Sequence, residues 1–176
     1  MSSIDPRYPI GKFSPQQSYS AEEVKKNLRR IASLPEKLAT AVQSLDNSQL
    51  DTPYRDGGWT IRQVIHHIAD SHLNAYIRTK WTLTENSPII KAYDEKSWAT
   101  TPENIAPPEL SLNILTALHI KWVELLDSLP PELLKKEFIH PDTKKQVAID
   151  RLIATYAWHG EHHLAHITGL KDKNEW

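Results

Sequence analysis

The apolar residues of this chain recur at a helical period in four long segments. In each segment they stand at every third or fourth position, which places them along one side of a helix. The segments cover residues 20–45, 60–84, 111–128 and 150–171. Alternation of apolar and polar residues, which is typical of half-buried strands, is almost absent. The pattern therefore predicts an all-α protein whose four helices pack as a bundle.

The ends of these helices are marked by particular residues. The first helix is expected to begin at the capping box Ser20–Glu23, and the second at the capping box Thr60–Gln63. Asp150 is the expected N-cap of the fourth helix. Pro35 lies inside the first segment, and we expect it to kink or split that helix because it removes an intrahelical hydrogen bond.

The connecting segments are rich in proline and differ in length. The chain suits a single domain, 1–176, in which residues 1–19 form an extended N-terminal arm. Residues 85–109 form a long loop that is either a lid over a pocket or a packed crossover connection. Residues 131–138 are expected to form a short helical piece, and residues 140–147 a turn or a small hairpin.

Composition excludes several classes of protein. The 21 lysines and arginines nearly balance the 22 aspartates and glutamates, so no basic surface for nucleic acid is expected. The chain has no cysteine, which excludes disulfides, zinc–thiolate sites and a cysteine nucleophile. No apolar run approaches the roughly 20 residues that span a bilayer, and no signal peptide is evident. We therefore expect a cytoplasmic protein without nucleic-acid or membrane partners.

Histidine is the residue type that suggests chemistry. Four of the nine histidines fall within eight residues of the fourth helix, with His159 and His163, and His162 and His166, spaced i, i+4. This spacing stacks two imidazoles on one helical face, where both can reach one metal ion. A second cluster lies upstream in residues 66–72. Two ligands from one helix and one from another give a three-nitrogen site with open positions, which is typical of catalytic zinc.

Helical geometry separates the histidines of the fourth helix. At 100° per residue, His163 lies roughly 40° and His159 roughly 80° from the centre of the apolar stripe. His166 lies roughly 100° away and His162 roughly 140° away by the same arithmetic. The inward pair is therefore His159 and His163. His162 is expected to be exposed, and His166 is marginal.

On the second helix the same arithmetic leaves the third ligand open. His72 lies within about 20° of the stripe centre, His67 about 120° away and His66 about 140° away. His72 is either the third ligand or a buried core histidine that bonds a neighbour. His67 shares a polar flank with Ser71 and Arg78, which is either a water-accessible cleft between helices or a solvated surface.

Several distinctive motifs follow one another along the chain. The two longest are residues 50–72, which include Asp-Gly-Gly-Trp-Thr and His-His, and residues 156–167, which read Tyr-Ala-Trp-His-Gly-Glu-His-His-Leu-Ala-His-Ile. Shorter ones are Tyr-Pro-Ile-Gly at 8–11, Tyr-Asp-Glu-Lys-Ser-Trp at 93–98 and His-Pro-Asp-Thr at 140–143. Together these motifs resemble the YfiT group of the DinB superfamily, and the matches cover nearly the whole chain.

The resemblance implies a fold and a metal site. The fold is a four-helix bundle in an up-down-down-up arrangement, with a long crossover between the second and third helices. The site holds one divalent ion per chain, zinc or nickel, on three histidines that map onto His67, His159 and His163. The resemblance thus selects His67 where geometry alone favoured His72.

The resemblance also implies a metal-dependent hydrolase acting on a small-molecule substrate. The alternatives are an S-transferase that uses a low-molecular-weight thiol of the bacillithiol type, and a metal-binding module without catalysis. An ion on three histidines supports either reaction, because it lowers the pKa of a bound water to about 7 and also that of a thiol. Asp70 is the nearest candidate for a general base, ahead of Asp94 and Glu161, and the lack of a clear base favours thiol transfer. A homodimer is compatible with the sequence.

Overall fold

Four long helices make up most of the computed structural model, which describes residues 5–176. They are α1 (Ala21–Val42), α3 (Ile61–Thr84), α5 (Glu109–Asp127) and α6 (Ile149–Asn174). The short elements are the helices α2 (Asn47–Leu50) and α4 (Glu95–Trp98), the 3₁₀ turns η1 (Pro102–Ile105) and η2 (Leu133–Lys135), and the strands β1 (Glu137–Ile139) and β2 (Gln146–Ala148). None of the described helices is long and apolar enough to span a membrane.

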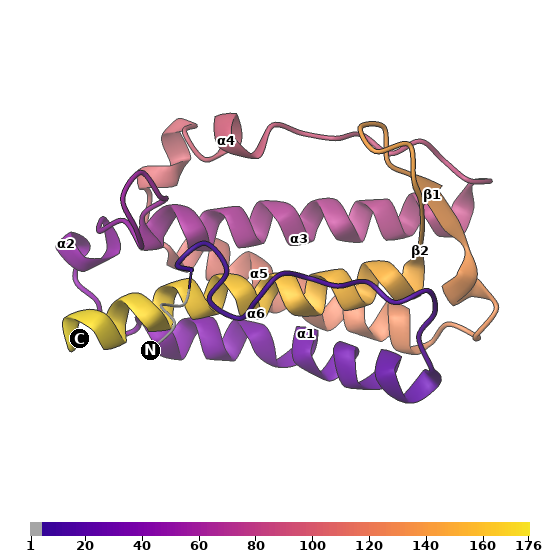
Figure 1. The fold of residues 1–176 in the computed structure, drawn as a ribbon, viewed down its shortest axis with the longest axis horizontal. Coiled ribbons are helices and arrows are strands. Elements are labelled where there is room, and N and C mark those ends of the chain that lie inside the picture. Colours follow the sequence, from indigo (N-terminus) through magenta and orange to yellow (C-terminus); the bar gives the residue numbers. More distant parts are fainter. Residues whose placement is uncertain (1–4) are drawn as a thin grey trace.

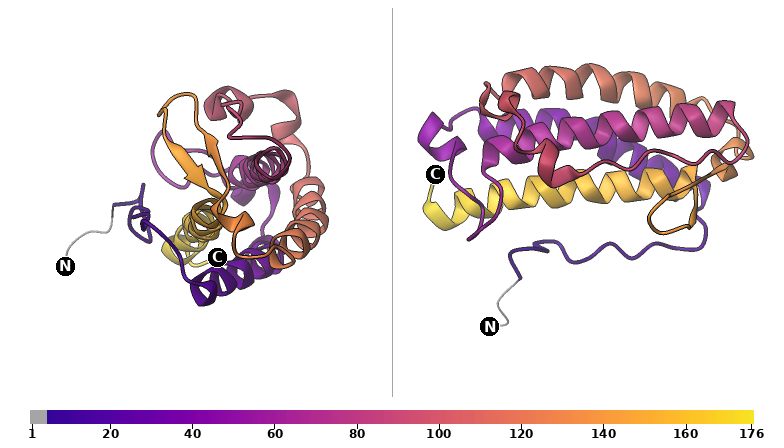
Figure 2. Two further views of the ribbon diagram at one scale, coloured as in Figure 1. Left: turned by 90° about the vertical axis from the view of Figure 1, so that its right-hand side faces the viewer. Right: turned by 90° about the horizontal axis from the view of Figure 1, so that it is seen from above.

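The long helices form a bundle with an unusual order of directions. α1 and α6 run one way and α3 and α5 run the other way (Figure 1). Each helix packs on two others, α1 on α5 and α6, and α3 on α5 and α6. Because the consecutive helices α3 and α5 are parallel, residues 85–108 return along the outside of α3 for the length of the bundle (Figures 1 and 2). The expected up-down-down-up bundle with its long crossover is confirmed.

The two capping boxes form as predicted. The Ser20 hydroxyl accepts a hydrogen bond from the Glu23 backbone N–H at 3.2 Å, and the Glu23 carboxylate accepts one from the Ser20 N–H at 2.8 Å. Thr60 and Gln63 make the same pair of bonds at 3.1 and 3.0 Å. The first turns of α1 and α3 therefore have partners for N–H groups that a helix leaves unpaired.

The prediction that Asp150 caps the last helix is wrong. Ala148 is the N-cap residue of α6, and Asp150 lies in the first turn, where its carboxylate accepts a hydrogen bond from Lys135 at 2.5 Å. The Ile149 N–H donates instead to the Lys136 carbonyl at 3.1 Å. The chain enters α6 directly from β2. A backbone carbonyl at the start of the hairpin therefore accepts the hydrogen bond that a capping side chain would otherwise accept.

Two further boundaries differ from the predictions. Of the two effects expected of Pro35, a kink or a split, the split does not occur, because α1 continues through this residue. Its neighbours Leu34 and Leu38 are buried in the core, and this packing offsets the lost hydrogen bond. α5 begins at Glu109 rather than Ser111, because Pro108 already has helical backbone angles.

A small hairpin precedes α6. β1 pairs antiparallel with β2, with Phe138 opposite Val147, and residues 140–145 form its turn. Part of the segment 131–138 is therefore a strand, and only η2 is helical. The Ile139 N–H donates to the Pro88 carbonyl at 2.9 Å, which ties the start of the crossover to the hairpin.

The core consists of two apolar clusters that are separated by histidines. One cluster contains Ala75 of α3 and Trp122 of α5, and the other contains Ile68 of α3 and Leu115 of α5. His72 and His119 lie between these positions on the two helices. The same order holds on α6, where the histidines follow the first cluster and precede Ile167 of the second.

The N-terminal arm covers one side of α6. Residues 5–19 form no helix or strand and run alongside this helix (Figures 1 and 2). Phe13 packs on Trp158 with ring centroids 5.8 Å apart, and Tyr8 lies 6.2 Å from His162. Residues 1–4 of the expected arm lie outside the described residues.

Candidate metal centre

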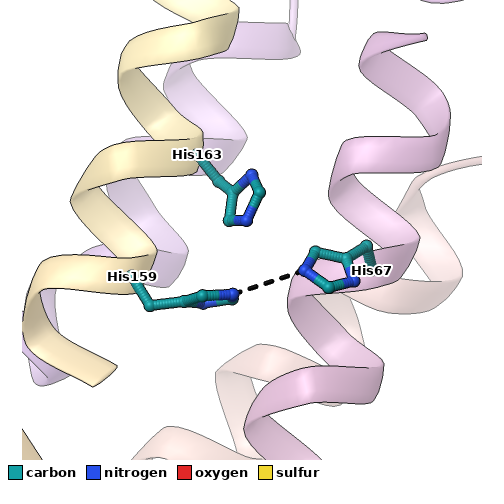
Figure 3. A group of neighbouring side chains, drawn as sticks. All are labelled: His67, His159 and His163. Atoms are coloured by element: carbon teal, nitrogen blue, oxygen red, sulfur yellow. Dashed lines mark hydrogen bonds between the residues drawn. The ribbon is translucent and has the colours of Figure 1, made fainter. Parts of the chain in front are cut away.

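Three histidines from two helices face one another in the bundle. His67 comes from α3, and His159 and His163 come from successive turns of α6, which packs antiparallel against α3 (Figure 3). One ring nitrogen of each histidine lies within 4.8 Å of one from each of the others. The Nε2 atoms of His67 and His159 are 3.3 Å apart. The structure therefore brings together the three residues that the family resemblance selected.

Burial of the group differs from what the polar flank of α3 indicated. His67 is only 3% exposed and His163 is also buried, whereas His159 is partly exposed. The flank of α3 that carries His67 and Ser71 faces α6 rather than water, because α3 packs on two helices. A helix with two buried sides has a core-facing surface wider than its apolar stripe, so this flank forms neither the water-accessible cleft nor the solvated surface that the sequence left open.

A chain of hydrogen bonds fixes the proton of His159. The Ile31 carbonyl lies 2.6 Å from His119 Nδ1, so that nitrogen must donate. In a neutral ring His119 Nε2 then accepts from His72 Nδ1 at 2.9 Å, and His72 Nε2 accepts from His159 Nδ1 at 3.3 Å. The remaining nitrogen, His159 Nε2, keeps its lone pair and points at His67. His72 is thus a buried histidine that bonds its neighbours, one of the two roles open from the sequence.

All of these rings are neutral near pH 7. Burial lowers the pKa of His67 and of His119 to about 4. Burial first, and neighbouring histidines second, hold the pKa of His72, His159 and His163 well below the usual value. A histidine must be neutral to bind a metal, so the group is in the required state.

The spacing of the two Nε2 atoms fits a shared ion. Two nitrogens at about 2.0–2.1 Å from a tetrahedral zinc ion lie about 3.3–3.4 Å from each other. The observed separation between His67 and His159 is 3.3 Å. His163 contributes a further buried ring whose Nδ1 has no hydrogen-bond partner among the described residues. The donor set is nitrogen only, which suits zinc or nickel and not magnesium or calcium.

Trp59 walls one side of the group. Its ring lies 4.6 Å from His67 and stacks 6.5 Å from His163, measured between centroids. The turn that presents it contains Gly57 at a φ of +63°, a conformation that other residues resist. The sequence predicted no role for Trp59, although the Gly-Gly-Trp motif just before a capping box was the available signal.

The candidate carboxylates lie elsewhere. Asp70 lines a small pocket with His66 and Glu103, where burial first and the Glu103 charge second raise its pKa to about 6. Glu161 forms an ion pair with Arg30 at 2.6 Å. Asp94 accepts hydrogen bonds from the first turn of α4. None of the carboxylates in residues 5–176 joins the three histidines as a potential ligand.

The other two histidines of α6 are buried, so the prediction that His162 is exposed is wrong, and His166, which was marginal, lies inside. His162 is 7% exposed and His166 is 5% exposed. His162 stacks on Trp158 with centroids 4.5 Å apart, and His166 stacks on Tyr54 at 4.0 Å. The angular position of a residue around α6 predicts only whether it faces the other helices. The arm and the loop before α3 cover its outer face as well.

Comparison with known proteins identifies the family. The family model described as the DinB superfamily matches residues 30–167, more than half of the chain. This chain belongs to the DinB superfamily. The resemblance drawn from its sequence motifs is confirmed.

Relatives within the DinB superfamily match the chain from end to end. YfiT of Bacillus subtilis (strain 168) is 46% identical over an alignment of 177 positions, which covers 100% of this chain and 99% of the relative. A protein of Bacillus mycoides (strain KBAB4) is 48% identical over 98% of this chain and 99% of its own length. The names of both describe them as candidate metal-dependent hydrolases.

A solved structure within the DinB superfamily has the same fold. The structure of YfiT from B. subtilis superposes with a TM-score of 0.96, at 46% identity, over 98% of this chain and 99% of that one. Its description gives that protein an unusual four-helix bundle topology. This chain and YfiT therefore share the arrangement of helix directions described above.

Proposed function

We propose that this protein is a metal-dependent hydrolase of a small-molecule substrate, with one zinc or nickel ion per chain held by His67, His159 and His163. The observation that carries the proposal is the pair of Nε2 atoms 3.3 Å apart, one of which has its lone pair fixed by hydrogen bonds. The relatives named as candidate metal-dependent hydrolases support the reaction class. When bound, the ion supplies Lewis acidity that makes water reactive near neutral pH.

The protein's own residues prepare this site. His67 and His163 approach from two helices, so the packing of α3 on α6 sets their separation. His72 and His119 hold His159 in the tautomer that offers Nε2 outward. Trp59 keeps water from one side of the rings, which strengthens electrostatic interactions there.

Thiol transfer is the second candidate, and one observation favours it. Among the described residues no carboxylate stands with the three histidines, so the site offers no obvious base for water. A low-molecular-weight thiol loses its proton more easily than water and needs less help at a metal. The same ligands would serve both reactions.

Metal content tests the binding site. Elemental analysis of the purified protein should find about one divalent ion per chain at this site, with no ligand type beyond imidazole. His67→Ala, His159→Ala and His163→Ala should each lose that tightly held ion, whereas His162→Ala should keep it. The matched control is His66→Ala, because His66 neighbours His67 but bonds Ser111 and Ala106 instead. Retention of the tight ion by His67→Ala would contradict the assignment.

Activity screens separate the three functions. The metal-loaded protein should hydrolyse members of an ester and amide panel, and His159→Ala should not. Turnover only when a low-molecular-weight thiol and an electrophile are both present would establish the transferase instead. A full complement of ion without activity in either screen would favour the module that binds metal without catalysis.

A further inference from the structure

A second group of three histidines lies on the outer side of α6. His162, His163 and His166 are 7%, 8% and 5% exposed, and one ring nitrogen of each lies within 4.8 Å of one from each of the others. The rings of His162 and His166 are one helical turn apart, with centroids separated by 4.4 Å. This group shares only His163 with the centre described above.

Nitrogens of this group lack partners in the part of the chain that the structure describes. His162 Nδ1 and His163 Nδ1 are buried without a hydrogen bond, and the ring of His166, also buried, is approached only by the backbone of Pro6 and Arg7. A buried polar atom without a partner is destabilising, so most such atoms in proteins are hydrogen-bonded. Three such rings at one place offer three lone pairs, which indicates a ligand that accepts several lone pairs at once.

The stacked aromatic rings do not supply such a partner. Trp158 covers the face of His162, and Tyr54 covers the face of His166. Stacking occupies the π faces of these rings and leaves the nitrogens, which lie at the ring edges, free. A groove lined by Pro6, Tyr54, Arg55 and Gly169 reaches His166 from the surface and gives a ligand its path.

We propose that His162 and His166 form a second site for a divalent transition-metal ion, zinc, nickel or copper, with His163 as a ligand shared with the first centre. The donor atoms are imidazole nitrogens only, which suits these ions and not magnesium or calcium. The sharing of His163 rests on the proposed function. The pair His162 and His166 does not depend on the proposed function, because two histidines spaced i, i+4 on one helix suffice to chelate an ion.

Sharing His163 couples the two sites. A neutral imidazole has one lone pair, because its other nitrogen carries the proton, so His163 serves one ion at a time. With the first centre filled, the second has two protein ligands and binds weakly. With the first centre disabled, the second has three. The Arg55 charge near His166 weakens the second site further.

Titration of the metal-free, full-length protein with Zn²⁺ tests the proposal. The wild type should bind one ion tightly and a second at least tenfold more weakly. His162→Ala and His166→Ala should lose the second ion and keep the first. His67→Ala and His159→Ala should lose the tight ion and bind the second ion more tightly than the wild type does, because His163 is then free for it. The double variant His159→Ala/His166→Ala, which breaks both i, i+4 pairs, should bind none.

The outcomes distinguish the two sites. If His162→Ala and His166→Ala bind the weaker ion as the wild type does, or the wild type binds only one, the second site is wrong. If His67→Ala and His159→Ala keep the tight ion, the first centre is wrong instead, and the two-histidine pair is tested on its own. His140→Ala, on the hairpin turn, is the matched control and should change neither step.

Fluorescence gives a second measurement that does not depend on affinity. Cu²⁺ and Ni²⁺ quench a nearby indole, and Trp158 stacks on His162 at 4.5 Å. The second binding step should therefore quench emission in the wild type. In Trp158→Phe that step should lose its quenching while the first step, near Trp59, keeps it. Equal quenching in both proteins at the second step would place the second ion elsewhere.

Discussion

At the scale of single residues, the histidine chain from the Ile31 carbonyl to His159 decides how well the metal is held. His119→Leu removes the acceptor for the His72 N–H, so neither His72 nor His159 keeps a fixed tautomer. Partners that orient a metal-binding histidine are typically worth about 10- to 100-fold in affinity. We expect that loss in Kd, measured by competition with a chelator, although all three ligands are intact.

The conservative variant separates positioning from packing. His119→Gln retains a donor for Ile31 and an acceptor for His72, and it should recover most of the affinity. If the leucine variant bound metal as tightly as the wild type, the chain would have no role at the site.

The buried ring of His119 should also make the stability of the protein depend on pH. Burial lowers the pKa of His119 to about 4, below its unfolded value of about 6.5. Between these values the unfolded chain binds more protons than the native one, so the free energy of unfolding falls as pH drops from about 6.5 to about 4. Urea unfolding of the metal-free protein should show this fall. His119→Gln should give a shallower one, and an unchanged slope would mean that other histidines cause it.

At the scale of elements, two glycines of α6 report how tightly α6 packs on α1. A Cβ at Gly160 would overlap the buried Leu34 side chain, whereas a Cβ at Gly169 would meet nothing within 4 Å. Gly160→Ala should therefore destabilise the protein by about 1–3 kcal/mol through overpacking. Gly169→Ala should stabilise it by about 0.5–1 kcal/mol, because alanine is the better helix former.

Denaturant unfolding of the two variants checks this pair. Leu34→Ala removes the obstructing methyl groups, so the cost of Gly160→Ala should shrink in the Leu34→Ala background. An equal effect of alanine at both glycines would show that the contact between α1 and α6 is looser than the structure has it.

At the scale of the whole molecule, the core and the candidate metal centre make separate contributions to stability. Two apolar clusters flank the histidines and bury side chains from all four long helices. The core should fold without an ion, unlike a zinc finger. An ion that binds only the native state adds stability in proportion to the logarithm of its free concentration.

Chelation should therefore lower the melting temperature but leave the helical circular dichroism at room temperature. Added zinc or nickel should restore the melt of the wild type. His159→Ala should melt like the chelated wild type and gain little when a single equivalent of metal is added. Loss of the helical signal on chelation would mean that the ion is structural, and it would remove the main support for catalysis.

The sequence by itself determined the four helices and the inward pair on the last of them. The period of apolar residues and the capping boxes are local properties, so they predicted α1, α3, α5 and α6 to within a few residues. His159 and His163 lie on the face that the phase of α6 indicates, because the facing of a helix follows from its residue spacing.

Only the tertiary structure decided the surroundings of these residues. Helix phase assigns one buried face, but α3 packs on two helices and α6 is also covered by the arm, so His67 and His162 are buried off the apolar stripe. Asp150 is not the cap that was predicted, because α6 follows directly on the β1–β2 hairpin and its first N–H group bonds the backbone there. Each of these outcomes depends on segments far apart in the sequence, and local periodicity carries no information about where such segments meet.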